Sequence, residues 1–202
     1  MTSVFTRIAR WLRSYRVPTP GIDNHYFRLA TQYYAAARGG VFAGCGTVAG
    51  NLFHHAVELY LKGDLSTGLS RVQLTKYGHN LRKLWSAYKR KHSSSPLSSF
   101  DATINALHKF EAIRYPNAIA AKGMFYGLPI TRPDPPLAFK VTSGSTPPTY
   151  LLVVNEVDEL IRGLLVASSV NPGFYFSQLG SEGRAIIYRD NPAFDPGPLT
   201  TA

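Results

Sequence analysis

The segment from Thr47 to Lys62 places the strongest constraint on how this chain folds. Its apolar residues recur every three or four positions, as along one face of an α-helix; they are Leu52, Phe53, Ala56, Val57, Tyr60 and Leu61. His55, Glu58 and Lys62 recur at the same spacing on another face, so their side chains are neighbours. We predict a helix that starts at about Thr47, ends at Gly63-Asp64 and carries a Glu58–Lys62 ion pair.

Four further segments show the same helical period, at about 23–38, 79–91, 99–113 and 151–166. We expect Gly39-Gly40 to end the first of them. Pro116 should end the third, because a proline disfavours helical backbone in the residue before it. Residues 66–77 are expected to form a connection with a short helical turn. Small residues between Ala43 and Gly50 permit close approach of two helices.

Two parts of the chain lack this period. Residues 117–148 are rich in Gly and Pro and include one strand candidate at 138–141, which predicts an irregular insertion. Near the C-terminus, residues 174–177 and 185–188 are rich in aromatic and β-branched side chains. Because Gly180-Ser181-Glu182-Gly183 separates them, they predict a β-hairpin.

The predicted fold class is therefore all-α: an antiparallel helical bundle with a small C-terminal β-hairpin. We divide the chain into an amphipathic basic arm at 1–22, the bundle at 23–170 with its insertion at about 117–148, and the hairpin and tail at 171–202. A chain of 202 residues, 45% of them apolar, is long enough for one core.

Cysteine content and the N-terminal sequence bear on the compartment. Cys45 is the only cysteine, so no disulfide forms within the chain. Arginines at 7, 10, 13 and 16 interrupt any apolar signal-peptide region. The apolar segment at 150–170 contains four charged residues, which are costly in a bilayer. We expect a cytoplasmic protein without a membrane span and without a membrane as its usual partner.

Positive charge is concentrated in the first two-thirds of the chain. Residues 1–133 contain 18 Lys and Arg against 5 Asp and Glu, a net of +13, whereas residues 134–202 contain 4 against 7, a net of −3. No acidic residue lies between Asp64 and Asp101, where seven basic ones occur: Arg71, Lys76, Arg82, Lys83, Lys89, Arg90 and Lys91. Such a surface attracts polyanions, although a solvated surface without a partner is the alternative.

Three short motifs lie on the predicted helices. They are Ala56, Glu58 and Lys62; His79 and Leu81; and Arg114, Tyr115 and Pro116. In order and spacing these motifs resemble the HEPN superfamily (higher eukaryotes and prokaryotes nucleotide-binding domains), over residues 23 to about 126. The resemblance implies a helical bundle, a homodimer, and RNA or a nucleotide as ligand.

Many catalytic HEPN proteins carry an Arg followed after about four to six residues by a His, and this pair supports metal-independent RNA cleavage. Here Ile119, Ala120 and Ala121 occupy the corresponding positions after Arg114, and no histidine follows Arg114. We therefore expect a non-catalytic module that binds RNA, a nucleotide or a protein partner through its basic face.

Two alternatives stay open. The first is an atypical metal-independent ribonuclease that uses His79 with Arg114 or Arg71. The second is a scaffold or membrane-surface protein that makes contact through residues 4–16, which have amphipathic helical spacing.

The expected ligand-binding residues are Glu58, Lys62, His79, Arg114, Arg82 and Lys83, with His79 and Arg114 as the catalytic candidates. The alternative for His79 is a structural role, because a histidine at a helix start easily finds a hydrogen-bond partner. Within this set, Arg114 is expected to pair with Glu58 or Glu111, and a pocket shared by Glu58, Lys62, His79 and Arg114 is our hypothesis.

No cofactor and no metal ion is expected. His54, His55 and Glu58 lie close together, and His54 and Glu58, one helical turn apart, are able to chelate a metal. However, no His-Glu-x-x-His motif and no second histidine-bearing helix at ligand spacing accompanies them.

Overall fold

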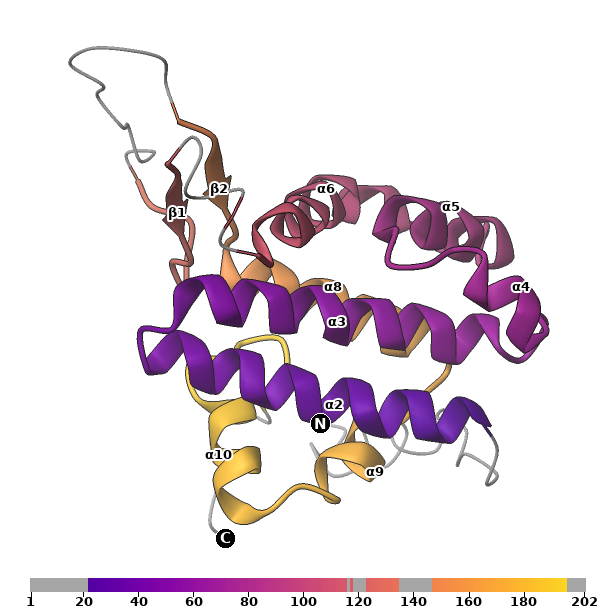
Figure 1. Cartoon of the computed structure of the whole chain (residues 1–202). Coiled ribbons are helices and arrows are strands. Elements are labelled where there is room, and N and C mark those ends of the chain that lie inside the picture. The colour runs from indigo at the N-terminus through magenta and orange to yellow at the C-terminus, as the bar shows by residue number, and fades with distance from the viewer. Residues whose placement is uncertain (1–21, 116, 118–122, 135–146, 196–202) are drawn as a thin grey trace, which may run out of the picture.

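The computed structural model describes residues 22–115, 117, 123–134 and 147–195. The N-terminal arm up to residue 21 and the strand candidate at 138–141 lie outside the described residues. The described part is mostly helical, with one small sheet (Figure 1).

Two long helices, α2 (Ile22–Phe42) and α3 (Gly46–Leu65), lie side by side and are joined by three residues (Figure 1). The predicted start of α3 is confirmed, but the prediction that Gly39-Gly40 ends α2 is wrong. A Cβ atom on Gly40 would lie 3.3 Å from the Cβ atom of Ala49. Gly40 is therefore a point of close contact between the two helices, where the missing side chain permits their approach.

The middle of the chain forms shorter helices on the side of α3 opposite α2 (Figure 1). Their bounds are α4 (Arg71–Thr75), α5 (Leu81–Lys91), η1 (Leu97–Phe100), α6 (Asp101–Phe110) and η2 (Glu111–Ile113). The helix α8 (Val154–Ala167) contacts both α3 and α6. These helices confirm the expected periodic segments, and α4 is the short helical turn expected within 66–77.

The sheet joins the two ends of the predicted insertion. Strands β1 (Phe125–Gly127) and β2 (Thr149–Leu151) pair in parallel, with Phe125 opposite Thr149 and Gly127 opposite Leu151. The 21 residues between them allow the chain to leave β1 and return in the same direction as β2.

The predicted C-terminal hairpin is wrong, because both of its segments are helical. They form α9 (Pro172–Phe176) and α10 (Ser181–Tyr188). Asn171 caps α9 by accepting a hydrogen bond from the amide of Gly173 at 2.9 Å, and Pro172 is at the first helical position. Ile187 of α10 is fully buried, and α10 packs on α2. The apolar residues that suggested strands instead anchor two short helices on the core.

The core forms where the apolar stripe of α3 meets its neighbours. Phe53, Val57 and Leu61 have no exposed surface, and they belong to one cluster with Leu84 of α5 and Leu160 of α8. Full burial of each such side chain contributes about 1.5–3 kcal/mol. Of the helices in the described ranges, none has the length and apolar character needed to cross a membrane.

Candidate functional site

Glu58 lies near the middle of α3, and its side chain is only 4% exposed. The Lys62 ammonium donates to Glu58 Oε1 at 2.6 Å, which confirms the predicted ion pair. The same ammonium donates to the carbonyl oxygen of Gly78 at 2.9 Å. Lys62 therefore ties α3 to the turn that precedes α5.

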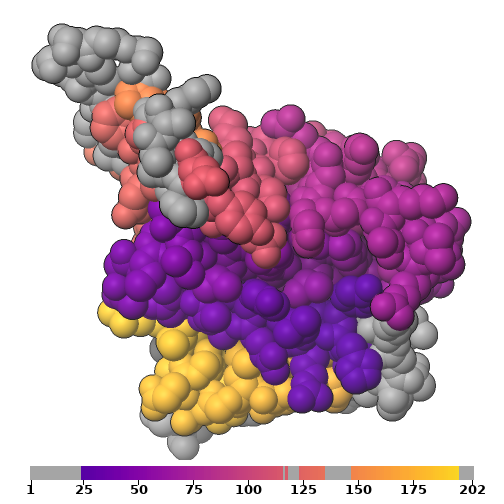
Figure 2. Space-filling view, viewed as in Figure 1, coloured from indigo at the N-terminus to yellow at the C-terminus, as the bar shows by residue number. Residues whose placement is uncertain are grey.

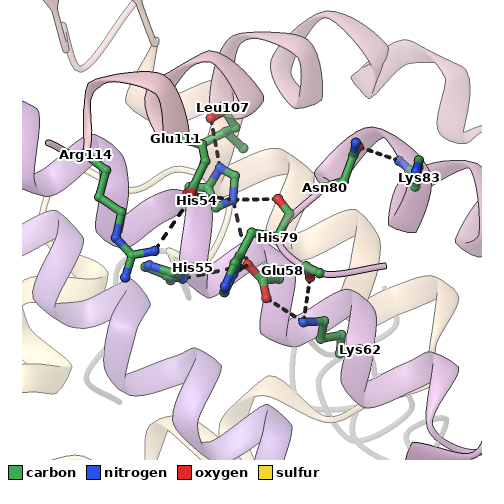
Figure 3. A network of polar contacts seen from close by, with 11 residues as sticks. His54, His55, Glu58, Lys62, His79, Asn80, Lys83, Leu107, Glu111 and Arg114 are labelled. Atoms are coloured by element: carbon green, nitrogen blue, oxygen red, sulfur yellow. Dashed lines mark hydrogen bonds and ion pairs between the residues drawn. The ribbon is translucent and has the colours of Figure 1, made fainter. Parts of the chain in front are cut away.

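His79 follows that turn and lies just before α5. Its Nδ1 is 3.0 Å from Glu58 Oε2, and its side chain is 56% exposed. The next residue, Asn80, caps α5 by accepting a hydrogen bond from the Lys83 amide at 3.1 Å. The helix cap thus fixes the backbone at the point where His79 reaches back to α3 (Figure 3).

Glu58, Lys62 and His79 form a network of polar contacts, and Arg114 joins this network only indirectly. Its Nη1 lies 3.6 Å from Glu111 Oε1, so of the two expected partners the structure selects Glu111 rather than Glu58. Glu111 Oε2 lies 3.6 Å from His54 Nε2, and the same ring nitrogen is 3.7 Å from Glu58 Oε2. The structure therefore brings Glu58, Lys62 and His79 into direct contact and connects Arg114 through Glu111 and His54 (Figure 3).

The network contains three further histidines that the list of expected site residues did not include. His54 is fully buried, with Nδ1 at 3.1 Å from the Leu107 carbonyl oxygen and Nε2 at 3.2 Å from that of His79. The His108 ring stacks on His54 at a centroid distance of 6.5 Å, and the His55 ring meets that of His79 at 5.9 Å. Four of the six histidines of the chain thus lie in one cluster. The one sequence signal for His108 was its position three residues before Glu111, on the same face of a helix.

Burial and hydrogen bonding act in opposite directions on the network's ionisable groups. Burial alone would raise the pKa of Glu58, but hydrogen bonds from His55 and Lys62, the charge of Lys62 and the contact with His79 bring this pKa down to about 2. Burial lowers the pKa of His54, against the effect of the Leu107 carbonyl and of two carboxylates. At neutral pH the site therefore holds an ionised Glu58 and an uncharged His54.

A second feature adjoins this network. Five basic side chains of α4, α5 and the α4 C-cap are exposed, and none forms an ion pair within the described part of the chain; they are Arg71, Lys76, Arg82, Lys83 and Arg90. We call this set the basic surface. Burial lowers the pKa of His108, and the charge of Arg82 lowers it further, so Arg82 is the member of the basic surface whose charge acts on the histidine cluster. Figure 2 shows the α4–α5 region in magenta on the outer surface, on the other side of the indigo helices from yellow α10.

Arg71 is separated from the network. It is the first residue of α4 and forms no hydrogen bond or ion pair with His79. Of the two arginines considered for catalysis, only Arg114 is linked to the histidine cluster by contacts.

Compared with known proteins, the chain matches no protein-family model, no curated protein and no solved structure.

Proposed function

We propose that this protein is a non-catalytic helical module of the HEPN type that binds RNA through the basic surface. The observation that carries the proposal is the exposure of five basic side chains without an acidic partner among the described residues. Each such cation can neutralise a phosphate and release a counterion, which is the main source of affinity in binding that does not depend on sequence.

Two other cations of the same region serve as an internal comparison. Lys89 pairs with Asp101 at 2.8 Å, and Lys91 pairs with Asp64 at 2.8 Å. These pairs link α5 to the start of α6 and to the end of α3, so they have a structural role. The five cations of the basic surface have no comparable contact with any described residue, which favours an external anion as their partner.

A hollow of about 430 Å³ beside the C-terminal end of α5 adds to this surface. It is lined by Lys89, Arg90 and several hydroxyl groups, those of Ser86, Ser93, Ser95 and Ser98. Hydroxyl groups and the guanidinium group of arginine, here that of Arg90, are common donors to phosphate oxygens in nucleic-acid complexes. The hollow therefore supports a path for an RNA backbone along α5.

The HEPN assignment rests on the three motifs and on the contacts that link them. The Glu58–Lys62 pair, His79 and Arg114 come from three separate elements, and all belong to one network. The close pairing of α2 and α3 supports an antiparallel bundle. As parts of the same proposal, we expect a homodimer and a cytoplasmic location. Sedimentation equilibrium measures the oligomeric state. The exposed Cys45, which forms no disulfide, favours the cytoplasm.

The test is binding of a labelled single-stranded RNA, followed by fluorescence anisotropy at about 50 mM salt. We expect the double variant Arg82→Glu/Lys83→Glu to lose about tenfold or more in affinity. The control, Arg28→Glu/Arg184→Glu, makes the same change in net charge at exposed residues of α2 and α10.

The control should bind nearly as well as the parent protein. Equal losses in the two double variants would reduce the proposal to an effect of net charge and overturn it. Absence of RNA binding by the parent, or binding of a nucleotide or a protein in place of RNA, would also overturn it.

One observation favours a second function, an atypical ribonuclease. Glu58 holds His79 by Nδ1, so the Nε2 of this half-exposed ring is available for proton transfer, as in a histidine oriented by a carboxylate. If this function is correct, the parent protein cleaves single-stranded RNA in the presence of a chelator and His79→Ala does not. Cleavage retained in His79→Ala, or absent from the parent, rejects it.

A further inference from the structure

We propose that His55, Glu58 and His79 form a binding site for a divalent transition-metal ion, and Zn²⁺ is the ion that we expect this site to bind. Each residue offers one ligand atom, and the three atoms lie within 4.8 Å of one another. This inference is independent of RNA binding, because it rests on the geometry of three side chains outside the basic surface.

Two of the three spacings between ligand atoms are close to those of a tetrahedral site, and the third is no more than 4.8 Å. His79 Nδ1 lies 3.0 Å and His55 Nδ1 lies 3.7 Å from Glu58 Oε2. For metal–ligand bonds of about 2.1 Å, tetrahedral geometry separates neighbouring ligand atoms by about 3.4 Å. Both distances differ from this value by a few tenths of an ångström, which small side-chain rotations can supply.

The three ligands come from rigid parts of the structure. His55 and Glu58 lie three residues apart on α3, one of the two longest helices, and His79 directly precedes the cap of α5. The ring of Tyr33 packs against that of His55 at a centroid distance of 5.6 Å. Such packing orients a ligand before the metal arrives.

Lys62 determines how Glu58 can bind. Its ammonium contacts Oε1, while Oε2 faces the two imidazoles. Glu58 would therefore be a ligand through one oxygen, with Lys62 as the hydrogen-bond donor to the other oxygen. The Lys62 ammonium already balances the negative charge of Glu58. The two imidazole nitrogens therefore determine most of the selectivity between metal ions, and nitrogen ligands favour Zn²⁺ over Mg²⁺ or Ca²⁺.

The site is open on one side. Glu58 is buried, the side chain of His55 is 19% exposed, and that of His79 is 56% exposed. A metal ion can therefore enter from solvent past His79 and keep a water molecule as its fourth ligand. Two His and one Glu with an open fourth position form a donor set that zinc sites in enzymes use.

Our expectation from the sequence that no metal binds considered His54, His55 and Glu58, with His54 and Glu58 as the chelating pair. In the structure His54 is directed into the core, where its ring nitrogens contact two backbone carbonyls. The neighbouring residue His55 faces the site instead, and His79 supplies the ligand that sequence spacing did not reveal.

The test is titration of the metal-free full chain with ZnCl₂ by calorimetry, and with Co²⁺ by visible absorption. We expect one Zn²⁺ per chain and a Co²⁺ spectrum typical of tetrahedral coordination. His79→Ala and His55→Ala should each weaken binding by about tenfold or more. His25→Ala, which removes an exposed histidine of α2 outside the cluster, should bind like the parent.

Thermal unfolding without metal checks that each variant folds, and His79 is exposed enough for its loss to be tolerated. The proposal is overturned if the parent binds no Zn²⁺, if both cluster variants bind as tightly as the parent, or if His25→Ala weakens binding as much as they do.

Discussion

Arg38 of α2 and Asp158 of α8 form an ion pair in which neither side chain has any exposed surface. The Tyr34 hydroxyl donates to Asp158 Oδ1 at 2.6 Å, and Asn191 Nδ2 donates to the Tyr34 oxygen at 2.8 Å. Burial raises the pKa of Asp158, against the charge of Arg38 and the hydrogen bond from Tyr34. Each buried charge therefore depends on its partner.

Arg38 also attaches the C-terminal segment to the core. Its Nε donates to the carbonyl oxygen of Ile186 at 3.2 Å, and its Nη2 donates to that of Arg189. One guanidinium group thus connects α2, α8 and α10.

The first prediction concerns removal of one charge of this pair. Arg38→Met leaves Asp158 buried without its partner, so we expect a loss of about 3–5 kcal/mol in the free energy of unfolding, measured with urea. The double variant Arg38→Met/Asp158→Leu should recover a large part of this loss, because no buried charge remains. If the free energy of unfolding of Arg38→Met stays within about 1 kcal/mol of the parent value, the prediction is contradicted.

The second prediction concerns the contact between α3 and α6 at Gly50. A Cβ atom on Gly50 would lie 2.2 Å from Cδ1 of Phe110, whose side chain is fully buried. We expect Gly50→Ala to destabilise the protein by about 1–3 kcal/mol in spite of the better helix propensity of Ala.

Gly68→Ala is the matched control, because a Cβ atom there would meet no atom within 4 Å. Its free energy of unfolding should stay within about 0.5 kcal/mol of the parent value. Equal stability of the two variants would show that Phe110 moves away without penalty.

The third prediction is a pH dependence of stability. In the folded protein the pKa of Glu58 is about 2, compared with 4.5 for an ordinary Glu. A lowered pKa contributes stability that is complete above about pH 4.5 and is lost as the pH falls towards 2. Between pH 5 and 2, the parent should lose about 3 kcal/mol more than Glu58→Gln, which has no carboxyl group to titrate.

The free energy of unfolding of both proteins, measured with urea across this range in a chelating buffer, checks this prediction. Parallel pH profiles would mean that the contacts of Glu58 with His55, Lys62 and His79 do not favour its ionised form.

Sequence patterns predicted the features that depend on local spacing. The α3 stripe and the Glu58–Lys62 pair follow from the helical period, and both are present. The C-terminal segments were misassigned because their aromatic and β-branched residues suit a strand as well as a buried helix face. For α9, the sequence signals in favour of a helix were Asn171 as the N-cap and Pro172 at the first helical position.

Contacts between distant elements could not be predicted from spacing. Asp158 follows Arg38 by 120 residues. His79 follows Glu58 by 21, and their contact was part of the hypothesis of a shared pocket, although their spacing did not indicate it. In each case the partner is set by how the helices pack. The histidine cluster was missed for the same reason, because His79 and His108 come from elements that meet only in the folded chain.

Mapping RNA on the surface of the isotope-labelled protein by nuclear magnetic resonance tests the central claim most directly. On addition of single-stranded RNA, the largest shift changes should occur at the amides and side chains of the basic surface, Arg71, Lys76, Arg82, Lys83 and Arg90, and should decrease as salt is added. Amides of α10, on the other side of α2, should not change. Changes centred on α10, or no change at low salt, would contradict the account.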